Sequence, residues 1–267
     1  MQRDFQFYIV PTPIGNMSDI SYRTVEVLKD VDIIACEDTR TTQNILNHYN
    51  ISTKTISYHK YNEQSRVEFF LDLIKEGKKI ALVSDAGTPM ICDPGSVLLK
   101  SLRENNVSVT SLPGACAVTT FLSQVPREDE TFIFVGFFPK TSQKAEDLLS
   151  KYFDTNLVFY ESPNRILDTL DLIKKIRGNV CVALGRELTK LFEEIIVDDV
   201  ENVIEHYKTG IKGEIVCMVY PNNKSDDFDI KSKILNLKQK GFKSKEISTI
   251  LSTLYNLNKN DVYKLTM

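Results

Sequence analysis

The sequence has few of the side chains from which disulfide frameworks and metal centres are built. Its five cysteines are odd in number and widely spaced, without a C-x-x-C pair, and it has three histidines. A disulfide scaffold needs paired cysteines, and a zinc site needs Cys and His ligands at short spacing. The sequence therefore argues against both, and we expect no metal. Cys181 and Cys217 lie in apolar runs and are predicted to be small buried side chains.

Long apolar runs are also missing. None approaches the roughly 18–20 residues that span a bilayer. The first residues lack the apolar stretch of a signal peptide. We therefore expect a protein of the reducing cytoplasm with no membrane partner.

Three familiar motifs are absent: the G-x-x-x-x-G-K-[ST] phosphate loop, the G-x-G-x-x-G dinucleotide fingerprint and the G-x-S-x-G nucleophile elbow. The segment PTPIGN at 11–16 follows the first predicted strand, where a dinucleotide-binding protein carries its glycine loop. Its two prolines make the segment rigid and leave few amide donors for a pyrophosphate. A nucleoside triphosphate, a dinucleotide and a serine hydrolase are therefore disfavoured.

The chain has little excess charge of either sign. Its 33 Lys and Arg stand against 36 Asp and Glu, a formal net charge of −3, which argues against a basic coat protein for nucleic acid. The charge is uneven along the chain, because residues 231–267 hold eight Lys against Glu246 and Asp261. That segment has a net charge of +6, which leaves −9 on the other 230 residues. We expect any contact with a polyanion to be local.

Short β-rich apolar runs alternate with helical patterns in the first half of the chain. In residues 63–76 the spacing i, i+3, i+4, i+7 predicts a helix, with Asn62 as its N-cap and Gly77 after its end. The predicted strands are 6–10, 31–36, 79–84 and 107–112. Unbroken apolar strands separated by amphipathic helices are typical of a mostly parallel sheet that is covered on both faces.

A polar stretch at 126–130 interrupts this pattern, and a second α/β series follows. Its predicted strands lie near 131–137, 156–161, 179–185 and 213–220, and its helices near 142–152, 163–175 and 199–208. The composition changes again after residue 222. We therefore expect an α/β protein with an N-terminal domain at 1–126, a C-terminal domain at 127–222 and a basic extension at 223–267.

The extension is predicted to contain three short helices, 230–240, 245–255 and 259–265. Two interpretations stay open. It is either a solvated helical appendage or a small helix-turn-helix-like module whose lysines contact phosphates. Lysine-rich helix faces are common, so the lysines alone do not decide between them.

Polar residues gather where the predicted strands end, which is where parallel α/β sheets bind ligands. The five strand-end segments are EDTR (37–40), SDAGTPMICDPG (84–95), PGACA (113–117), ESP (161–163) and RELTK (186–190). Simpler structural interpretations exist for them: turn formers in 84–95, acids at helix N-termini in 37–40 and 161–163, and a surface ion pair in 186–190. A plain β–α loop takes only about 2–6 residues, however, so the long loop at 84–95 indicates one that wraps a ligand.

These segments, in this order, resemble the tetrapyrrole methylase superfamily, and within it the branch that modifies small-subunit ribosomal RNA. The resemblance covers residues 5–220, and the basic extension is similar to the helical extension of that branch. The matching segments are YIVPTPIGNMSDIS (8–21), DIIACEDTRTT (32–42), HKYNEQ (59–64), IALVSDAGTPMICDPG (80–95), LPGACA (112–117), GFFPK (136–140), FYESPNR (159–165), GRELTKLFEE (185–194) and KGE (212–214).

The resemblance implies two α/β domains, a parallel-sheet N-terminal one and a mixed-sheet C-terminal one, with S-adenosylmethionine in the cleft between them, and a homodimer. It also implies 2′-O-methylation of a cytidine ribose in the decoding region of 16S ribosomal RNA, within the small ribosomal subunit. Carried over to this chain, it implies cofactor contacts from Pro13, Asp85, Gly87, Thr88, Ala115, Cys116, Ala117, Tyr160, Leu184, Glu214 and Ile215. Ala115 stands where many relatives carry a proline, which predicts a looser loop.

Methyl transfer to a ribose hydroxyl requires an in-line arrangement and help with the hydroxyl proton, for which a general base supplies roughly 10²–10⁴-fold. The strand-end positions make three carboxylates candidate bases, Asp38, Glu161 and Glu187. The same positions make Arg40, Arg186 and Lys190 candidates to hold RNA phosphate or the ribose. The sequence does not choose among the carboxylates.

Two other functions stay open from the sequence. A porphyrinoid methyltransferase of the cobalamin pathway shares the superfamily fold, but EDTR, RELTK and the basic extension argue against it. A non-catalytic RNA-binding or ribosome-assembly factor would keep the basic extension, but the intact SDAGTP and LPGACA segments argue against that.

Overall fold

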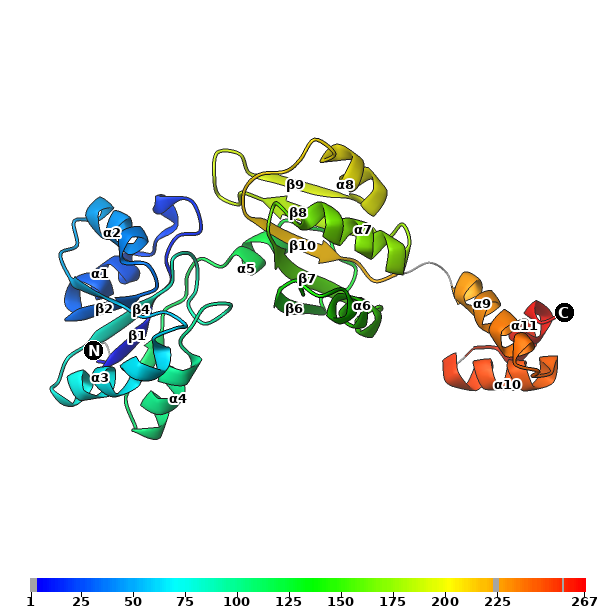
Figure 1. Ribbon diagram of the computed structural model, residues 1–267, viewed down its shortest axis with the longest axis horizontal. Helices are drawn as coiled ribbons and strands as arrows, with labels where there is room; N and C mark the ends of the chain where they lie inside the picture. The colour runs from blue at the N-terminus through cyan, green and yellow to red at the C-terminus, as the bar shows by residue number, and fades with distance from the viewer. Residues whose placement is uncertain (1–3, 223–225, 256) are drawn as a thin grey trace. The chain divides into compact units, whose positions relative to one another are not determined.

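A computed structural model describes residues 4–222, 226–255 and 257–267. The chain divides into two compact units, Met1–Tyr220 and Pro221–Met267, which we call the body and the tail. The body contains two five-stranded sheets, and the described part of the tail is helical (Figure 1). Among the described residues, no helix is both long enough and apolar enough to cross a membrane.

The first sheet and its helices form the N-terminal lobe of the body. Its strands are parallel in the order β3-β2-β4-β1-β5, and alternate residues of the central strands enter two separate buried clusters, one on each face. The predicted parallel sheet is therefore confirmed. The strands are β1 (Phe7–Ile9), β2 (Ile33–Cys36), β3 (Lys54–Ser57), β4 (Ile80–Val83) and β5 (Val109–Ser111), and the helices are η1 (Met17–Asp19), α1 (Tyr22–Asp30), α2 (Thr39–His48), α3 (Glu63–Lys75) and α4 (Ser96–Glu104).

The connection from β3 to α3 differs in detail from the prediction. The edge strand β3 was not predicted, because its residues KTIS are partly exposed and form no apolar run. The predicted helix at 63–76 is α3, and Gly77 follows it at φ +85°. Asn62 precedes α3 but does not cap it with its side chain. Its amide instead accepts from the His59 N–H (2.8 Å) and donates to the Ser57 carbonyl (3.2 Å), which fixes the turn before the helix.

The second sheet and its helices form the C-terminal lobe. Its order is β6-β7-β10-β8-β9, with β6 parallel to β7 and the other neighbours antiparallel, so the predicted mixed sheet is confirmed. Strand β9 was not predicted, since half of its residues, EIIVDD, are charged. The strands are β6 (Phe132–Phe137), β7 (Asn156–Glu161), β8 (Cys181–Arg186), β9 (Glu194–Asp199) and β10 (Ile215–Val219), and the helices are α6 (Ser142–Lys151), α7 (Ile166–Arg177) and α8 (Val200–His206).

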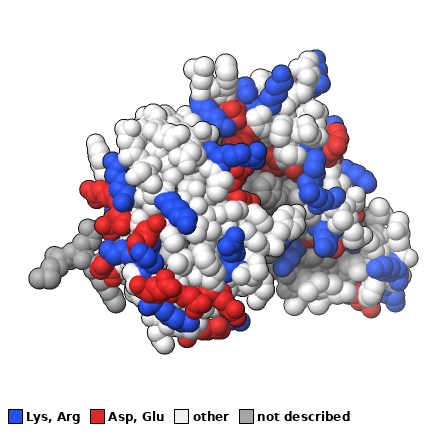
Figure 2. Space-filling model, turned by 60° about the vertical axis from the view of Figure 1, so that its left-hand side comes forward, with Lys and Arg blue, Asp and Glu red and all other residues white. Residues whose placement is uncertain are grey.

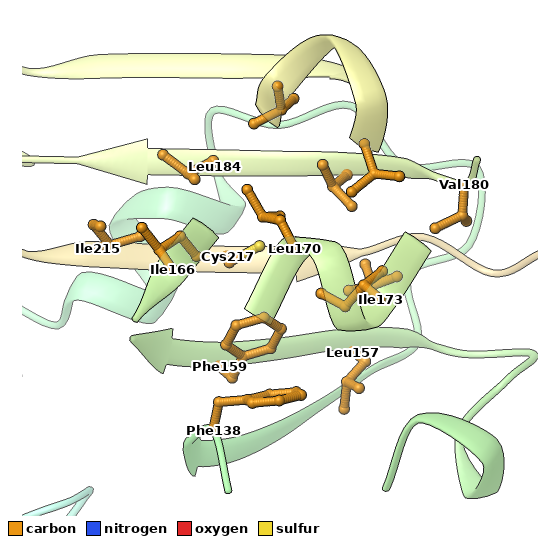
Figure 3. Packing of buried hydrophobic residues seen from close by; sticks show 14 of the residues in the cluster. Phe138, Leu157, Phe159, Ile166, Leu170, Ile173, Val180, Leu184, Ile215 and Cys217 are labelled. Carbon is orange, nitrogen blue, oxygen red and sulfur yellow. The ribbon is translucent and has the colours of Figure 1, made fainter. Parts of the chain in front are cut away.

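One face of the second sheet carries these three helices over a continuous apolar core. Leu170 and Ile173 of α7 pack with Phe159 of β7 and Cys217 of β10 (Figure 3). Cys217 is buried as predicted, whereas Cys181 is only half-buried.

The opposite face of the second sheet joins the two lobes. Helix α5 (Ala117–Leu122) follows the N-terminal lobe, and its Val118 and Phe121 pack against side chains of β7, β8 and β10. Ile14, from the loop after β1, belongs to the same buried cluster. The loops at the ends of β1 and β5 are therefore fixed against the C-terminal lobe, and the body behaves as one compact unit.

The tail has its own small core. Its helices are α9 (Asp226–Gln239), α10 (Ser244–Tyr255) and α11 (Lys259–Leu265), so the three predicted helices are confirmed. The buried side chains are Ile230, Ile234, Ile247, Leu251 and Val262. Outside this core, the exposed lysines are Lys238, Lys240, Lys243, Lys245, Lys259 and Lys264.

Candidate functional site

A cavity of about 470 Å³ lies between the two lobes, where strand-end loops of both sheets meet. This volume is within the range of about 300–1,000 Å³ that is usual for small-molecule sites. The N-terminal half is lined by Ile14, Glu37, Asp85–Thr88, Ile91–Asp93, Cys116 and Ala117, and the C-terminal half by Phe137, Tyr160–Pro163, Leu188 and Gly213–Val216. A smaller hollow of about 220 Å³ shares Ile14, Asp85, Ala86 and Glu214 with the cavity and is also lined by Pro13 and Lys190.

The long loop at 84–95 is tied to the loop after β1 by its own backbone. Thr12 and Gly87 exchange two backbone hydrogen bonds, of 2.9 and 3.0 Å, and the Thr12 hydroxyl donates to the Ser84 carbonyl (3.1 Å). Gly87 has φ +79°, and a Cβ there would lie 3.2 Å from Ile14 Cγ2. The Thr88 hydroxyl donates to the Ala115 carbonyl (2.9 Å), which joins the loop after β5. Three strand-end loops thus form one hydrogen-bonded rim of the cavity.

Most of the predicted cofactor residues lie at this cavity. Those that line it are Asp85, Gly87, Thr88, Cys116, Ala117, Tyr160, Glu214 and Ile215. Pro13 lines the adjoining hollow, and Ala115 lies behind Thr88. Leu184 is fully buried in the core under α7 and does not line the cavity (Figure 3).

Aromatic side chains form part of the C-terminal wall. The rings of Phe137 and Tyr160 meet edge to face with centroids 5.6 Å apart, and Phe137 is 65% exposed. Burial raises the pKa of Tyr160, so its hydroxyl stays protonated. The sequence reasoning did not include Phe137, although GFFPK was one of the matching segments.

Three carboxylates, Glu37, Asp85 and Asp93, line the N-terminal half, and we call them the acidic wall. Burial raises the pKa of Glu37 and of Asp93, and repulsion from Asp85 raises both further. Asp85 accepts a hydrogen bond from the Asp38 N–H (3.0 Å). Such a wall favours a cation, because a positive charge relieves the repulsion among its members.

The predicted base Asp38 is hydrogen-bonded and ion-paired to Arg40. The Asp38 carboxylate caps α2 and accepts from the Arg40 N–H (2.8 Å), Nε (3.1 Å) and Nη2 (2.6 Å). These hydrogen bonds lower the pKa of Asp38 to about 2. Arg40 itself is 89% exposed in its side chain, so it faces solvent while it holds Asp38.

The predicted base Glu161 lies at the end of β7 with a side chain that is 1% exposed. One oxygen accepts from the Ser162 N–H (2.7 Å), and the other accepts from the Thr169 hydroxyl (3.0 Å) and lies 3.2 Å from Arg165 Nη2. Both oxygens are therefore engaged in holding the start of α7.

The third predicted base, Glu187, belongs to a strained turn that also contains Lys190. Glu187 has φ +50° and Thr189 has φ +65°, a region that costs side-chain-bearing residues energy. Lys190 Nζ lies 2.9 Å from Glu187 and 3.0 Å from Glu214, and Glu187 also accepts from the Glu214 N–H (3.0 Å). The hydrogen bond from Lys190 lowers the pKa of Glu187. The third predicted cation, Arg186, pairs with Glu194 at 2.6 Å.

The turn at 187–190 packs closely against two glycines, Gly213 and Gly15, where a larger side chain would collide with it. A Cβ on Gly213 would lie 2.5 Å from Glu187 Cδ, and one on Gly15 would lie 2.5 Å from Lys190 Cγ and 3.0 Å from the Leu188 carbonyl. The turn at 187–190 is thus held between the loop after β1 and the loop before β10, and it forms one side of the cavity.

The fold defines a class, the two-lobed α/β proteins in which a parallel and a mixed five-stranded sheet meet at a cavity. Diphthine synthase has this fold with a TM-score of 0.65 and 12% identity, over 80% of this chain and 89% of that one. Uroporphyrin-III-C-methyltransferase from Thermus thermophilus has a TM-score of 0.57 and 14% identity, over 82% of this chain and 93% of the other. Likenesses at this identity establish the fold alone.

Sequence comparison identifies the family. Residues 6–204 match the tetrapyrrole (corrin/porphyrin) methylases, and the chain belongs to this family. Three relatives share the name ribosomal RNA small subunit methyltransferase I. The protein of Hydrogenobaculum sp. (strain Y04AAS1) is 45% identical over 82% of this chain and 96% of its own length. Those of Buchnera aphidicola subsp. Acyrthosiphon pisum and Escherichia coli O157:H7 are 40% and 39% identical, over 96% and 98% of this chain and 94% of their own lengths.

Methyltransferases of this family use S-adenosylmethionine, and the cavity fits that cofactor. The sulfonium is a cation and suits the acidic wall, in which Glu37 has no hydrogen-bond partner within the described part of the chain. The adenine ring suits the apolar and aromatic side chains of Ile14, Phe137 and Tyr160.

Proposed function

We propose that this protein transfers a methyl group from S-adenosylmethionine to the 2′-hydroxyl of a cytidine ribose in 16S ribosomal RNA, in the decoding region of the small ribosomal subunit. The observation that carries the proposal is the 40% identity to a ribosomal RNA small subunit methyltransferase I over 96% of the chain, a span that includes the tail. The porphyrinoid methyltransferases share the fold at 13–16% identity, which gives no support for a porphyrinoid substrate.

We assign cofactor binding to the rim and walls of the cavity: Pro13, Asp85, Gly87, Thr88, Ala115, Cys116, Ala117, Tyr160, Glu214 and Ile215, with Leu184 supporting them from the core. When bound, S-adenosylmethionine supplies an electrophilic methyl group on a positively charged sulfur. The hydrogen-bonded rim fixes the position of the ligand, and good positioning is worth about 7–11 kcal/mol of a transfer barrier. The interlobe packing of Ile14 keeps bulk water from that side of the cavity.

The RNA is held by local cations. Arg40 is exposed at the start of α2 and keeps free guanidinium donors while it holds Asp38. Lys190 and Arg186 are already paired with carboxylates, so they position the rim unless RNA phosphate displaces those partners. On the face that Figure 2 shows, basic and acidic side chains lie interspersed. Positive charge is concentrated on the exposed lysines of the tail, and we assign these lysines to contacts with RNA phosphates.

The proposal includes a cytoplasmic homodimer, as the family resemblance implies. It is tested with labelled S-adenosylmethionine and small ribosomal subunits from a strain that lacks the modification. Label mapped to one cytidine ribose supports the proposal. Cofactor binding without transfer to RNA favours a porphyrinoid substrate, and the absence of cofactor binding favours an assembly factor.

A further inference from the structure

Glu37 differs from the other carboxylates of the cavity in that its side chain accepts no hydrogen bond from the residues that the structure describes. It follows β2 at the carboxyl end of the parallel sheet and lines the cavity in a half-buried position. Among the described residues, nothing donates a hydrogen bond to its carboxylate and no cation pairs with it. Its lone pairs are therefore available to a ligand in the cavity.

Every other carboxylate that lines the cavity already has a donor. Asp85 accepts from the Asp38 N–H (3.0 Å), and the neighbouring Ser84 hydroxyl offsets part of the rise in the pKa of Asp93. Glu161 is saturated by Ser162, Thr169 and Arg165, and Glu214 pairs with Lys190. A base must accept a proton from the substrate, so a carboxylate with both oxygens free is better placed than one that already accepts a hydrogen bond.

The segment HKYNEQ places His59 at the same sheet edge as Glu37. Strands β2 and β3 are parallel neighbours with Cys36 opposite Ser57, and the Tyr58 N–H donates to the Cys36 carbonyl (2.8 Å). Both chains leave the sheet together, so His59 emerges beside Glu37. The turn that carries His59 is fixed by Asn62, as described above. His59 Nδ1 is buried and has no hydrogen-bond partner among the described residues.

The same segment is anchored to the loop at 84–95. The Glu63 carboxylate accepts from the Tyr58 hydroxyl (2.8 Å), the Gly95 N–H (2.9 Å) and the Val97 N–H (3.2 Å). The loop that carries Asp85 and Asp93 and the turn that carries His59 are thus held in one network around Glu37.

The groups around Glu37 make it a stronger proton acceptor than an ordinary glutamate. Burial raises its pKa, and Asp85 and Asp93 from the loop after β4 raise it further, while His59 from the turn after β3 lowers it. On its own segment, Asp38 and Arg40 neutralise each other. A carboxylate whose pKa is raised accepts a proton more strongly than the ion-paired carboxylates of Asp38 and Glu187, whose pKa values are lowered.

We propose that Glu37 is the general base of methyl transfer and that His59 is a positioning residue that sets its charge and orientation. The inference rests on the proposed function. The ribose hydroxyl gives its proton to the Glu37 carboxylate while a lone pair of its oxygen forms the bond to the methyl carbon. The electron pair of the breaking carbon–sulfur bond stays on sulfur, which leaves a neutral thioether, and the proton on Glu37 passes to solvent.

The test is single-turnover transfer to unmodified small subunits by Glu37→Gln, with saturating S-adenosylmethionine. We expect the rate at saturating cofactor to fall by roughly 10²–10⁴-fold, while calorimetry shows that the variant still binds S-adenosylmethionine and is therefore folded. Glu37→Asp should recover part of the rate. Glu68→Gln, on the exposed face of α3, is the matched control and should keep the full rate.

The role of His59 needs readouts that a structural effect does not produce. The wild-type rate should rise with pH through the pKa of Glu37, and this limb should move to higher pH in His59→Gln, because His59 lowers that pKa. NMR titration of labelled glutamate carboxyls in the protein without cofactor should show the same upward shift.

The outcomes separate the two proposals. A wild type that binds the cofactor but transfers nothing to RNA overturns the proposed function and this inference with it. An active wild type with an equally active Glu37→Gln overturns the inference alone, as does a loss confined to Glu161→Gln, Glu187→Gln or Asp38→Asn. An unmoved pH limb and unmoved Glu37 titration in His59→Gln overturn the role of His59.

Discussion

The two halves of the cavity carry similar numbers of acids but use them differently. In the N-terminal half, Glu37 and Asp93 are held near one another and near Asp85, so burial and repulsion raise their pKa values. In the C-terminal half, Glu161 and Glu214 line the cavity and Glu187 lies in the adjoining turn at 187–190. These three carboxylates accept hydrogen bonds from cations, a hydroxyl or backbone amides. The carboxylates of the N-terminal half can therefore exchange protons or bind a cation, whereas those of the C-terminal half hold the cavity in shape.

The largest expected effect concerns the stability of the C-terminal half. Replacing Glu161 by Ala removes the partner of Ser162, Thr169 and Arg165 at a nearly fully buried position. Breaking such a buried pair should lower the free energy of unfolding by about 3 kcal/mol. Urea unfolding measures the change, and Glu37→Ala serves as the matched variant in the other half, with an expected change below about 0.5 kcal/mol. Equal losses in both variants would abolish the distinction between the halves.

The next effect concerns the shape of the rim. Gly213→Ala places a Cβ 2.5 Å from Glu187 Cδ at φ +95°, so the turn at 187–190 has to move. Overpacking of this kind costs about 1–3 kcal/mol, and we expect S-adenosylmethionine affinity to fall about tenfold in calorimetry.

Gly210→Ala is the matched control for Gly213→Ala. It imposes the same backbone strain at φ +102° with nothing within 4 Å. It should cost about 1–2 kcal/mol of stability and leave cofactor affinity unchanged. If both variants bound the cofactor equally, the turn at 187–190 would have no part in the shape of the site.

A smaller effect is expected in RNA affinity when residues 224–267 are removed. If the tail lysines contact phosphates, RNA affinity should fall by about tenfold at low salt, and the slope of log affinity against log salt should flatten by about 0.7–0.9 per lost contact. Cofactor affinity should be unchanged, because the cavity is lined by body residues. Filter binding across salt concentrations measures the slope. An unchanged slope would mean that the tail is only a helical appendage and that the body binds the RNA alone.

The smallest effect is a pair of opposite pH dependences. The pKa of Glu187 is lowered, so its pairing stabilises the fold above its ordinary value of 4.5 and the stabilisation is lost as pH falls. The pKa of Glu37 is raised, so its ionisation destabilises the fold as pH rises above 4.5. At pH 7, Glu187→Gln should therefore be less stable than the wild type by about 0.2–1 kcal/mol, and Glu37→Gln should be slightly more stable. Thermal unfolding between pH 4 and 8 measures both, and shifts of the same sign would contradict the comparison.

Much of this architecture could be predicted from the sequence, because it depends on local patterns. Apolar runs and strand-end loops predict β2, β4, β7 and β10 and bring Asp85, Thr88 and Tyr160 to one cavity. Strands β3 and β9 were missed, since edge strands with exposed or charged residues lack the apolar signal.

The ionisation of the site could not be predicted, because it depends on tertiary partners. Asp38 and Glu37 are adjacent in sequence, yet their environments differ. Asp38 pairs with Arg40, whereas Glu37 is influenced by the turn after β3 and the loop after β4. The candidate bases named from the sequence stay predictions, and the strand-end rule that selected them also covered Glu37. The segment HKYNEQ could have drawn attention to Glu37, because it matches the family and its His59 lies at the same edge of the sheet.

The division between the two halves is tested most directly by NMR titration of Glu37 and Glu187 in one labelled sample without cofactor. We predict that Glu37 titrates above the ordinary value of 4.5 and Glu187 below it. A Glu37 that titrates at or below the value found for Glu187 would contradict it.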